Sequence, residues 1–285
     1  MLESLGCDLN YKLWTAKLIE KNPDAIIQTH LAYIKAGAQC ISTASYQASI
    51  LGLMEVGHSK KSAKMLIENS VRLAEAAIQQ ALDSGIIKKR ILIAGSIGPY
   101  GAFLADGSEY RGNYEIFDTK LHEFHLERIE ILDQSNTDLL ACETIPSFKE
   151  AKVLSDILAK AQKPSWVSFS CKDAKHINDG SEIANSVSIF KDHPKVYAIG
   201  VNCTHPKYIS EIIQTIKETG IDKKIIVYPN SGEAYNAKTK TWVGLSEPLY
   251  FAEMAQEWLE LGVDIIGGCC RIGPDHIRSI QHVFN

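Results

Sequence analysis

Short apolar runs alternate with longer helical segments along this 285-residue sequence, and this alternation limits the fold more than any other feature. The runs are apolar on both faces, as strands are in a parallel sheet that helices cover on both sides. The sequence therefore predicts one α/β domain, residues 1–285, with the architecture of a (β/α)8 TIM-type barrel. The predicted strands are Cys40–Ser45, Arg90–Ile97, Thr137–Glu143, Ser165–Cys171, Val196–Cys203, Lys224–Pro229 and Val263–Gly268.

The helical segments between these runs carry recognisable start and stop signals. Asn22 is suited to cap a helix that begins at Pro23, and Gly37 is suited to end it. A long helical pattern covers Ser59–Ser84, and Pro274 begins the last helix. We therefore expect each strand to be followed by a helix that packs on the outside of the sheet.

The predicted barrel is incomplete. A closed barrel of this type has eight strands, whereas only seven runs are found, and the segment Met1–Tyr11 does not resemble a strand. Either the sheet is open between its first and last strands, or another element fills the gap. Because open sheet edges need cover, we expect a chain that lacks the first strand to lose stability or to associate.

Two long connections, Gly98–Tyr114 and Asn230–Leu245, follow predicted strands. In barrels of this type the loops after the strands build the active site at the C-terminal face of the sheet. We therefore expect the functional site at that face.

Composition excludes several classes of partner. The net charge is −4 and the pI is about 6.1, and no basic tract is present, so we expect neither nucleic acid nor an acidic membrane as a partner. No run of roughly 20 apolar residues and no secretory signal is found, which predicts a cytoplasmic protein. In a reducing compartment the seven cysteines favour metal binding or catalysis over a disulfide framework.

Three cysteines lie at the ends of predicted strands. Cys203 ends the segment GVNC, and Cys269 and Cys270 follow two glycines. Neighbours on a regular strand point to opposite faces, but the glycines let the backbone turn so that both thiols can face one ion. Three thiolates would leave the fourth position of a tetrahedral zinc open, as in catalytic sites. Small buried cysteines are the alternative, and His205 is a competing ligand unless it begins a helix capped by Thr204.

The chain closely resembles the homocysteine S-methyltransferase family, especially the members that use S-methylmethionine as methyl donor. In that family the three cysteines bind zinc, so the resemblance implies a zinc site formed by Cys203, Cys269 and Cys270. Family members also begin with a strand carrying an Asp-Gly motif, which has no counterpart here, so the domain is expected to be shortened at its N-terminus. The matching segments are Ser42–Ser49, Ala94–Tyr114, Leu140–Pro146, Gly200–Cys203, Val227–Glu233 and Ile265–Arg271.

Two further residues have roles that the resemblance implies. Glu143 matches a family glutamate that binds the amino group of homocysteine, although its position alone fits an ion pair with a lysine or arginine equally well. Tyr46 matches a position beside the metal and substrate, although packing at the rim is its alternative role.

Four polar residues in the matching segments complete the predicted substrate site. Asn202 precedes the first zinc cysteine. Asn230, Glu233 and Arg111 lie in the matching loops and are candidates to contact the methyl donor, with solvated loop polarity as the alternative.

These features together predict zinc-dependent methyl transfer from a sulfonium donor, S-methylmethionine or S-adenosylmethionine, to the thiol of L-homocysteine, giving methionine. Selenocysteine is an alternative acceptor, because a selenolate suits the same zinc site. Two other functions stay open: a zinc- or thiol-binding barrel that lost activity with its first strand, and a redox protein with a Cys269–Cys270 disulfide. The sequence predicts small-molecule substrates and gives no indication of oligomeric state.

Overall fold

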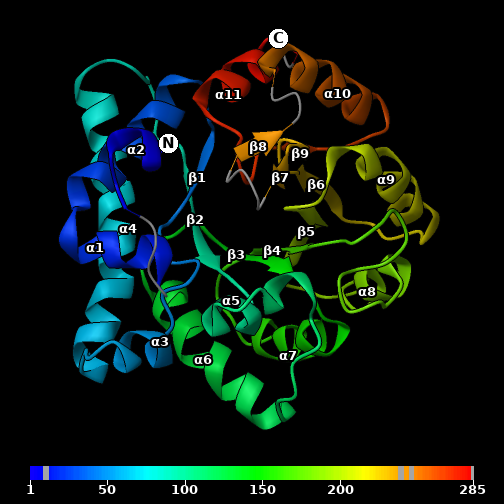
Figure 1. Ribbon diagram of the computed structural model, residues 1–285, viewed down its shortest axis with the longest axis horizontal. Helices are drawn as coiled ribbons and strands as arrows, with labels where there is room; N and C mark the ends of the chain where they lie inside the picture. The colour runs from blue at the N-terminus through cyan, green and yellow to red at the C-terminus, as the bar shows by residue number, and fades with distance from the viewer. Residues whose placement is uncertain (9–12, 237–240, 244–246, 284–285) are drawn as a thin grey trace.

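A computed structural model describes residues 1–8, 13–236, 241–243 and 247–283 of the chain. Seven parallel strands form one curled sheet in the order β1-β2-β3-β4-β5-β6-β9, and helices surround it (Figure 1). All seven predicted strands are found, although several are shorter than predicted. Their bounds are β1 Cys40–Ser42, β2 Leu92–Ile97, β3 Leu139–Ile145, β4 Ser165–Phe169, β5 Val196–Asn202, β6 Lys224–Tyr228 and β9 Ile265–Ile266.

Helices connect the strands, and the predicted cap Asn22 begins the first long one. The Asn22 side chain accepts a hydrogen bond from the Ala25 amide at 3.3 Å, and Ser59 caps the next long helix in the same way. The helices are α1 Leu18–Lys21, α2 Pro23–Lys35, α3 Ile50–Glu55, α4 Lys60–Asp83, α5 Tyr100–Leu104, α6 Asp118–Gln134, α7 Phe148–Leu158, α8 Ile183–Ser188, α9 Ile209–Glu218, α10 Pro248–Glu260 and α11 Pro274–Gln281.

The apolar core has two parts because the curled sheet has two faces. The larger part lies between the outer face of the sheet and the surrounding helices, where side chains such as Ile67, Leu154 and Ile213 are fully buried. The smaller part lies on the other face and contains Ala94, Ala141, Trp166, Ala198, Ile226 and Tyr228. Burying one large aliphatic side chain contributes about 1.5–3 kcal/mol to the stability of the fold. Because side chains on both faces of the sheet are buried in this way, the strands and their ends are held in fixed positions.

The sheet is open between β1 and β9, which stand at opposite ends of the strand order. Within the described residues no strand pairs with the free edge of either, and residues 1–8 contain only a short 3-10 turn. A cavity of about 900 Å³ lies there, lined by both edge strands. Across the opening, Tyr33 of α2 donates a hydrogen bond to the Ile272 carbonyl at 2.8 Å, which ties the two edges of the sheet together.

The loop predicted over Asn230–Leu245 is partly ordered into a hairpin, which the sequence analysis missed. Strands β7 (Ala234–Asn236) and β8 (Thr241–Val243) pair antiparallel, with Tyr235 opposite Trp242. Residues 237–240 and 244–246 of this segment lie outside the described part of the chain.

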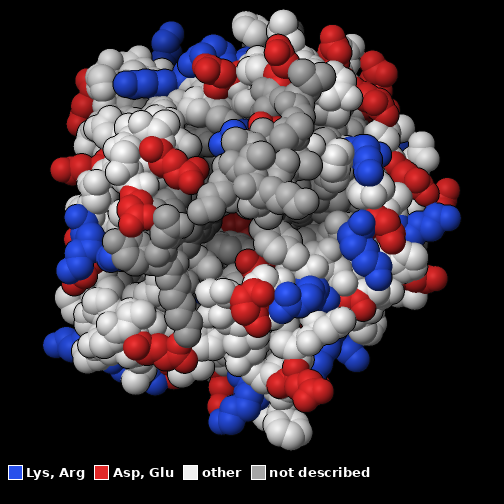
Figure 2. All heavy atoms as spheres, viewed as in Figure 1, with Lys and Arg blue, Asp and Glu red and all other residues white. Residues whose placement is uncertain are grey.

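The face shown in Figure 2 is hollowed near its centre, and basic and acidic residues alternate around its periphery. Among the residues that the structure describes, no helix is both long enough and apolar enough to cross a membrane.

Candidate metal centre

Three cysteine thiols converge at the C-terminal ends of two strands. Cys203 follows β5, and Cys269 and Cys270 follow β9. Their three Sγ atoms all lie within 4.8 Å of one another, and the Cys203 and Cys270 sulfurs are 3.4 Å apart. The thiols therefore occupy one small volume at the face of the sheet where the sequence predicted the site.

The local backbone explains how neighbouring cysteines reach one point. Cys203 adopts a left-handed conformation with φ of 48°, and its amide donates to the Tyr228 carbonyl at 3.2 Å. At Gly268 a Cβ atom would lie 2.0 Å from Ile272 Cγ2, so only glycine fits there. The Cys269 amide then bonds to the Pro229 carbonyl at 2.8 Å, which holds the turn after β9 in place.

The spacing and electrostatics of the sulfurs fit a divalent metal ion. Tetrahedral zinc with Zn–S distances of about 2.3 Å places its sulfur ligands about 3.8 Å apart, close to the spacing found here. Hydrogen bonds from Cys203 and Cys269 lower the pKa of the Cys270 thiol to about 3. Hydrogen bonds of Cys269 with Cys203 and Cys270, together with burial, raise the pKa of the Cys269 thiol well above its usual value. The protein alone thus stabilises one thiolate, and a cation is needed to ionise the rest.

Glu143 lies near the C-terminal end of β3 with 8% of its surface exposed. It accepts a hydrogen bond from the Ser96 hydroxyl on β2. Burial raises the pKa of this carboxyl, and hydrogen bonds with Ser96 and Tyr228 oppose that rise. Among the described residues no lysine or arginine forms an ion pair with Glu143. The ion pair that the sequence analysis gave as its alternative role is therefore not found there. Its substrate role stays a prediction.

Asn202 is almost fully buried, and the protein itself occupies its hydrogen-bonding groups. Its Oδ1 accepts from the Thr144 amide at 2.6 Å and from the Ser168 hydroxyl at 2.9 Å. Its Nδ2 donates to Thr144 Oγ1 at 2.7 Å and lies 3.8 Å from Cys269 Sγ. Asn202 thus joins β3, β4 and β5 directly beneath one of the cysteines.

Two tyrosines lie beside the cysteines, and the sequence analysis selected only one of them. Burial raises the pKa of the Tyr46 hydroxyl well above its usual value, and a hydrogen bond with Thr144 opposes this. The Tyr110 hydroxyl lies 3.9 Å from Cys203 Sγ. Nearby, Glu109 has a buried Oε2 atom without a hydrogen-bond partner. Glu109 and Tyr110, which the sequence analysis did not select, are the two residues before Arg111 in the same matching loop. The predicted role of Arg111 stays a prediction.

The three predicted loop residues make contacts mainly within their own loops. Asn230 Oδ1 accepts from the Gly232 amide at 3.0 Å. Glu233 pairs with Arg271, the residue after the cysteine pair, at 3.1 Å. Although burial opposes it, this pairing lowers the pKa of Glu233. Arg111 pairs with Asp106 at 3.6 Å.

Thr204 was predicted to cap the helical segment that follows Cys203, but it does not. The Nδ1 of His205 accepts from the Lys207 amide at 3.2 Å and caps the short 3-10 turn Pro206–Tyr208. Thr204 instead accepts from the Cys171 amide through its hydroxyl. Cys171 and the three remaining cysteines outside the cluster pack against apolar residues.

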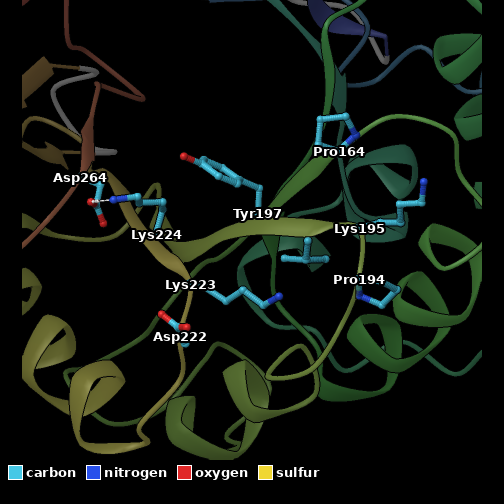
Figure 3. Close-up of a pocket in the computed structure, with 9 residues that line it drawn as sticks. Pro164, Pro194, Lys195, Tyr197, Asp222, Lys223, Lys224 and Asp264 are labelled. Carbon is cyan, nitrogen blue, oxygen red and sulfur yellow. Dashed lines mark hydrogen bonds and ion pairs between the residues drawn. The ribbon is translucent and has the colours of Figure 1, made fainter.

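A second hollow, of about 410 Å³, lies at the opposite ends of the strands (Figure 3). Lys224 begins β6, and its ammonium pairs with Asp264 at 2.7 Å. Lys195, which directly precedes β5, is bonded to the Gln162 carbonyl. Both of these cations therefore already have partners within the protein.

The comparisons with known proteins agree with this geometry. The family model described as homocysteine S-methyltransferase matches residues 1–284. The homocysteine S-methyltransferase YbgG of Bacillus subtilis is 44% identical, over 98% of this chain and 90% of its own length. The homocysteine methyltransferase MmuM of Escherichia coli, solved in an oxidized form, superimposes with a TM-score of 0.88 at 38% identity, covering 99% of this chain and 91% of that one.

The same Escherichia coli protein has also been solved in a metallated form. That structure has a TM-score of 0.87 to this chain at 38% identity and covers 99% of this chain and 92% of its own. The chain described here therefore belongs to the homocysteine S-methyltransferase family of enzymes.

Proposed function

We propose that this enzyme transfers a methyl group from a sulfonium donor, S-methylmethionine in the first place, to homocysteine held at a zinc ion. The observation that carries the proposal is the convergence of the Cys203, Cys269 and Cys270 sulfurs within 4.8 Å. Bound to these residues, zinc would hold the homocysteine sulfur as a thiolate and so supply a nucleophile at neutral pH.

The residues around the thiols suit an amino-acid substrate. Glu143 provides a buried carboxyl without a cationic partner among the described residues, and an ammonium group would supply one. Asn202 holds Thr144 and approaches Cys269, and so keeps the strand ends at a fixed spacing. A fixed spacing is what alignment of a nucleophilic sulfur with a methyl carbon requires.

A sulfonium donor suits the groups present at this face. The C–S bond of the donor breaks as the new C–S bond forms, and its electron pair stays on a neutral thioether. Because this thioether is neutral, no residue has to protonate the leaving group, and the proton of the homocysteine thiol is lost to solvent. Tyr46 and Tyr110 both interact with the thiols through their hydroxyl groups. If either ring faces the donor, it would favour a cation, because aromatic faces attract positive charge.

The decisive experiment measures metal and methyl transfer on the same preparation. We expect about one zinc per chain, and methionine carrying a labelled methyl group when labelled S-methylmethionine and homocysteine are supplied. Cys203→Ala should lose the zinc and at least 1,000-fold of the activity, since a two-thiolate site no longer provides the three ligands of an open catalytic site. Cys40→Ala, at a cysteine of β1 outside the cluster, is the matched control.

The same preparation separates the competing functions. A zinc-loaded chain that forms no methionine with either sulfonium donor would be a binding protein rather than an enzyme. A chain that holds no zinc, and whose thiol titration falls by two upon mild oxidation, would instead indicate a redox role for the adjacent cysteines.

A further inference from the structure

A second polar cluster lies in the helix layer, away from the thiols. Arg128 and His125 of α6 and Glu150 of α7 have exposed fractions of 1%, 0% and 0%. Charged side chains are almost never buried to this degree unless they are paired. The proposed chemistry uses none of the three, so their burial requires another explanation.

The three side chains form a continuous hydrogen-bonded chain. His125 Nε2 lies 2.7 Å from Glu150 Oε1, and His125 Nδ1 lies 3.2 Å from Arg128 Nη2. A guanidinium only donates, so Nδ1 must accept and the imidazole proton must be on Nε2, pointing to Glu150. Burial, together with the positive charge of Arg128, holds the pKa of His125 well below its usual value, which keeps the ring neutral.

From this cluster, hydrogen bonds reach two separate loops. Arg128 Nη1 donates to the Tyr46 carbonyl at 3.0 Å, and Nη2 donates to the Gly98 carbonyl at 2.6 Å. The Gly98 amide in turn donates to the Tyr46 carbonyl at 3.1 Å. One guanidinium therefore fixes both the loop after β1 and the loop after β2. Any side chain at position 98 would prevent this contact, because a Cβ would lie 2.6 Å from the Tyr46 oxygen.

Glu150 holds the second loop at two more points. Its Oε1 accepts from the Tyr100 amide at 2.6 Å, and its Oε2 bonds to the Tyr114 hydroxyl. These contacts lie at the beginning and the end of the segment that carries Tyr110, whose hydroxyl is 3.9 Å from Cys203 Sγ. The loop that places the Tyr110 hydroxyl near Cys203 is therefore attached to the helix layer at both ends.

We propose that Arg128, His125 and Glu150 act together as positioning residues that fix Tyr46 and the 98–114 loop over the cysteines for methyl transfer. This inference rests on the proposed function. The cluster touches neither the thiols nor Glu143 through any of the contacts described above. It acts instead through the backbone of the two loops, and buried hydrogen bonds of this kind hold a reacting geometry more rigidly than solvated ones.

The test uses substitutions that alter the geometry of the cluster while keeping its polarity. Arg128→Lys keeps the charge but cannot bond to both carbonyls and His125, so kcat/KM for methyl transfer should fall at least tenfold with bound zinc unchanged. Glu150→Ala should have a similar effect. Glu150→Gln should restore activity to within about threefold of the wild type, because its amide can bond to Tyr100, His125 and Tyr114 in the same places.

Hydrogen exchange provides a readout that a general loss of stability would not reproduce. In Arg128→Lys the amides of Gly98 and Tyr100 should exchange at least tenfold faster, while amides of β4 and β5 stay protected. Asp133→Asn is the matched control, since Asp133 is a buried carboxylate of the same helix that bonds to the amides of Gln162 and Lys163, far along the chain from both loops. It should leave kcat/KM and exchange in the 98–114 loop unchanged.

The proposal is overturned if Arg128→Lys and Glu150→Ala lose no more activity than Asp133→Asn, or if exchange rises equally throughout the sheet. Should Arg128→Lys fail to fold, Tyr114→Phe removes a single hydroxyl from the cluster and should still increase exchange at the end of the loop. If the wild type proves inactive in methyl transfer, the proposed function fails, whereas the exchange measurement still shows whether the cluster holds the loops.

Discussion

The cysteine centre and the cluster around Glu150 are both polar, and both are largely buried, but they differ in how far the protein satisfies their groups. The three thiols share a site that stabilises one negative charge, and Glu143 has no cationic partner among the described residues. Around Glu150, in contrast, backbone amides, carbonyls and side chains of the chain itself bond to all the polar groups except Arg128 Nε. Buried groups left without partners indicate a place for a ligand, whereas satisfied ones indicate a scaffold.

The largest effect is expected from Gly268→Ala, which should disrupt the cysteine centre. The new methyl group would meet Ile272 at 2.0 Å, so the turn that brings Cys269 and Cys270 to one side must shift. We expect zinc affinity to fall at least 100-fold and activity to fall with it, measured by competition with a chromogenic chelator. Gly267→Ala is the control, because its Cβ meets Tyr228 only at 3.3 Å; equal zinc affinity in both variants would contradict the steric argument.

Glu143→Gln should sharpen the comparison by testing the buried carboxyl that has no cationic partner among the described residues. If Glu143 binds the ammonium of homocysteine, its loss should raise the KM for homocysteine about 10- to 100-fold, the range expected for one charge-assisted hydrogen bond of about 1.5–3 kcal/mol. Zinc content should stay unchanged. The deaminated analogue 4-mercaptobutyrate should react equally with both enzymes, and a similar loss with the analogue would assign Glu143 to a role other than amine binding.

The same distinction explains what the sequence could predict. Seven strands were predicted correctly because each is a short apolar run, and those in the middle of the sheet are buried on both faces. The cysteine cluster was predicted from the family resemblance together with the positions of Cys203 and Cys269 at strand ends. The hairpin β7–β8 was missed because its segment is polar and rich in turn-forming residues, with no apolar alternation. Arg128 was missed for a different reason: on a helix, an arginine is usually solvated, and only tertiary packing buries it.

The turn after Cys203 shows in the same way that tertiary packing can override a local sequence preference. Threonine is the more common capping residue, so Thr204 was expected to cap the turn after Cys203. The strand end places Thr204 toward Cys171 instead, and His205 caps the turn. Local preferences can name the type of contact that a segment needs, but the register of neighbouring strands decides which side chain makes it.

The smallest expected effect concerns the second half of the comparison and appears only as a pH dependence. Burial raises the pKa of Glu150 to about 8, although the Tyr100 amide opposes this, whereas in the unfolded chain it is near 4.5. Because the folded state favours the protonated form, the stability that Glu150 contributes is full below about pH 4.5 and is lost as the pH rises through 8. Relative to Glu150→Gln, the wild type should therefore lose unfolding free energy steadily as the pH rises from 5 to 8. Urea unfolding of both proteins across this range measures the difference, with Glu123→Gln on the exposed side of α6 as the control.

A difference in unfolding free energy that does not change with pH would show that the surrounding donors hold Glu150 ionised throughout. The cluster would then be an ion pair between Glu150 and Arg128 bridged by a neutral imidazole.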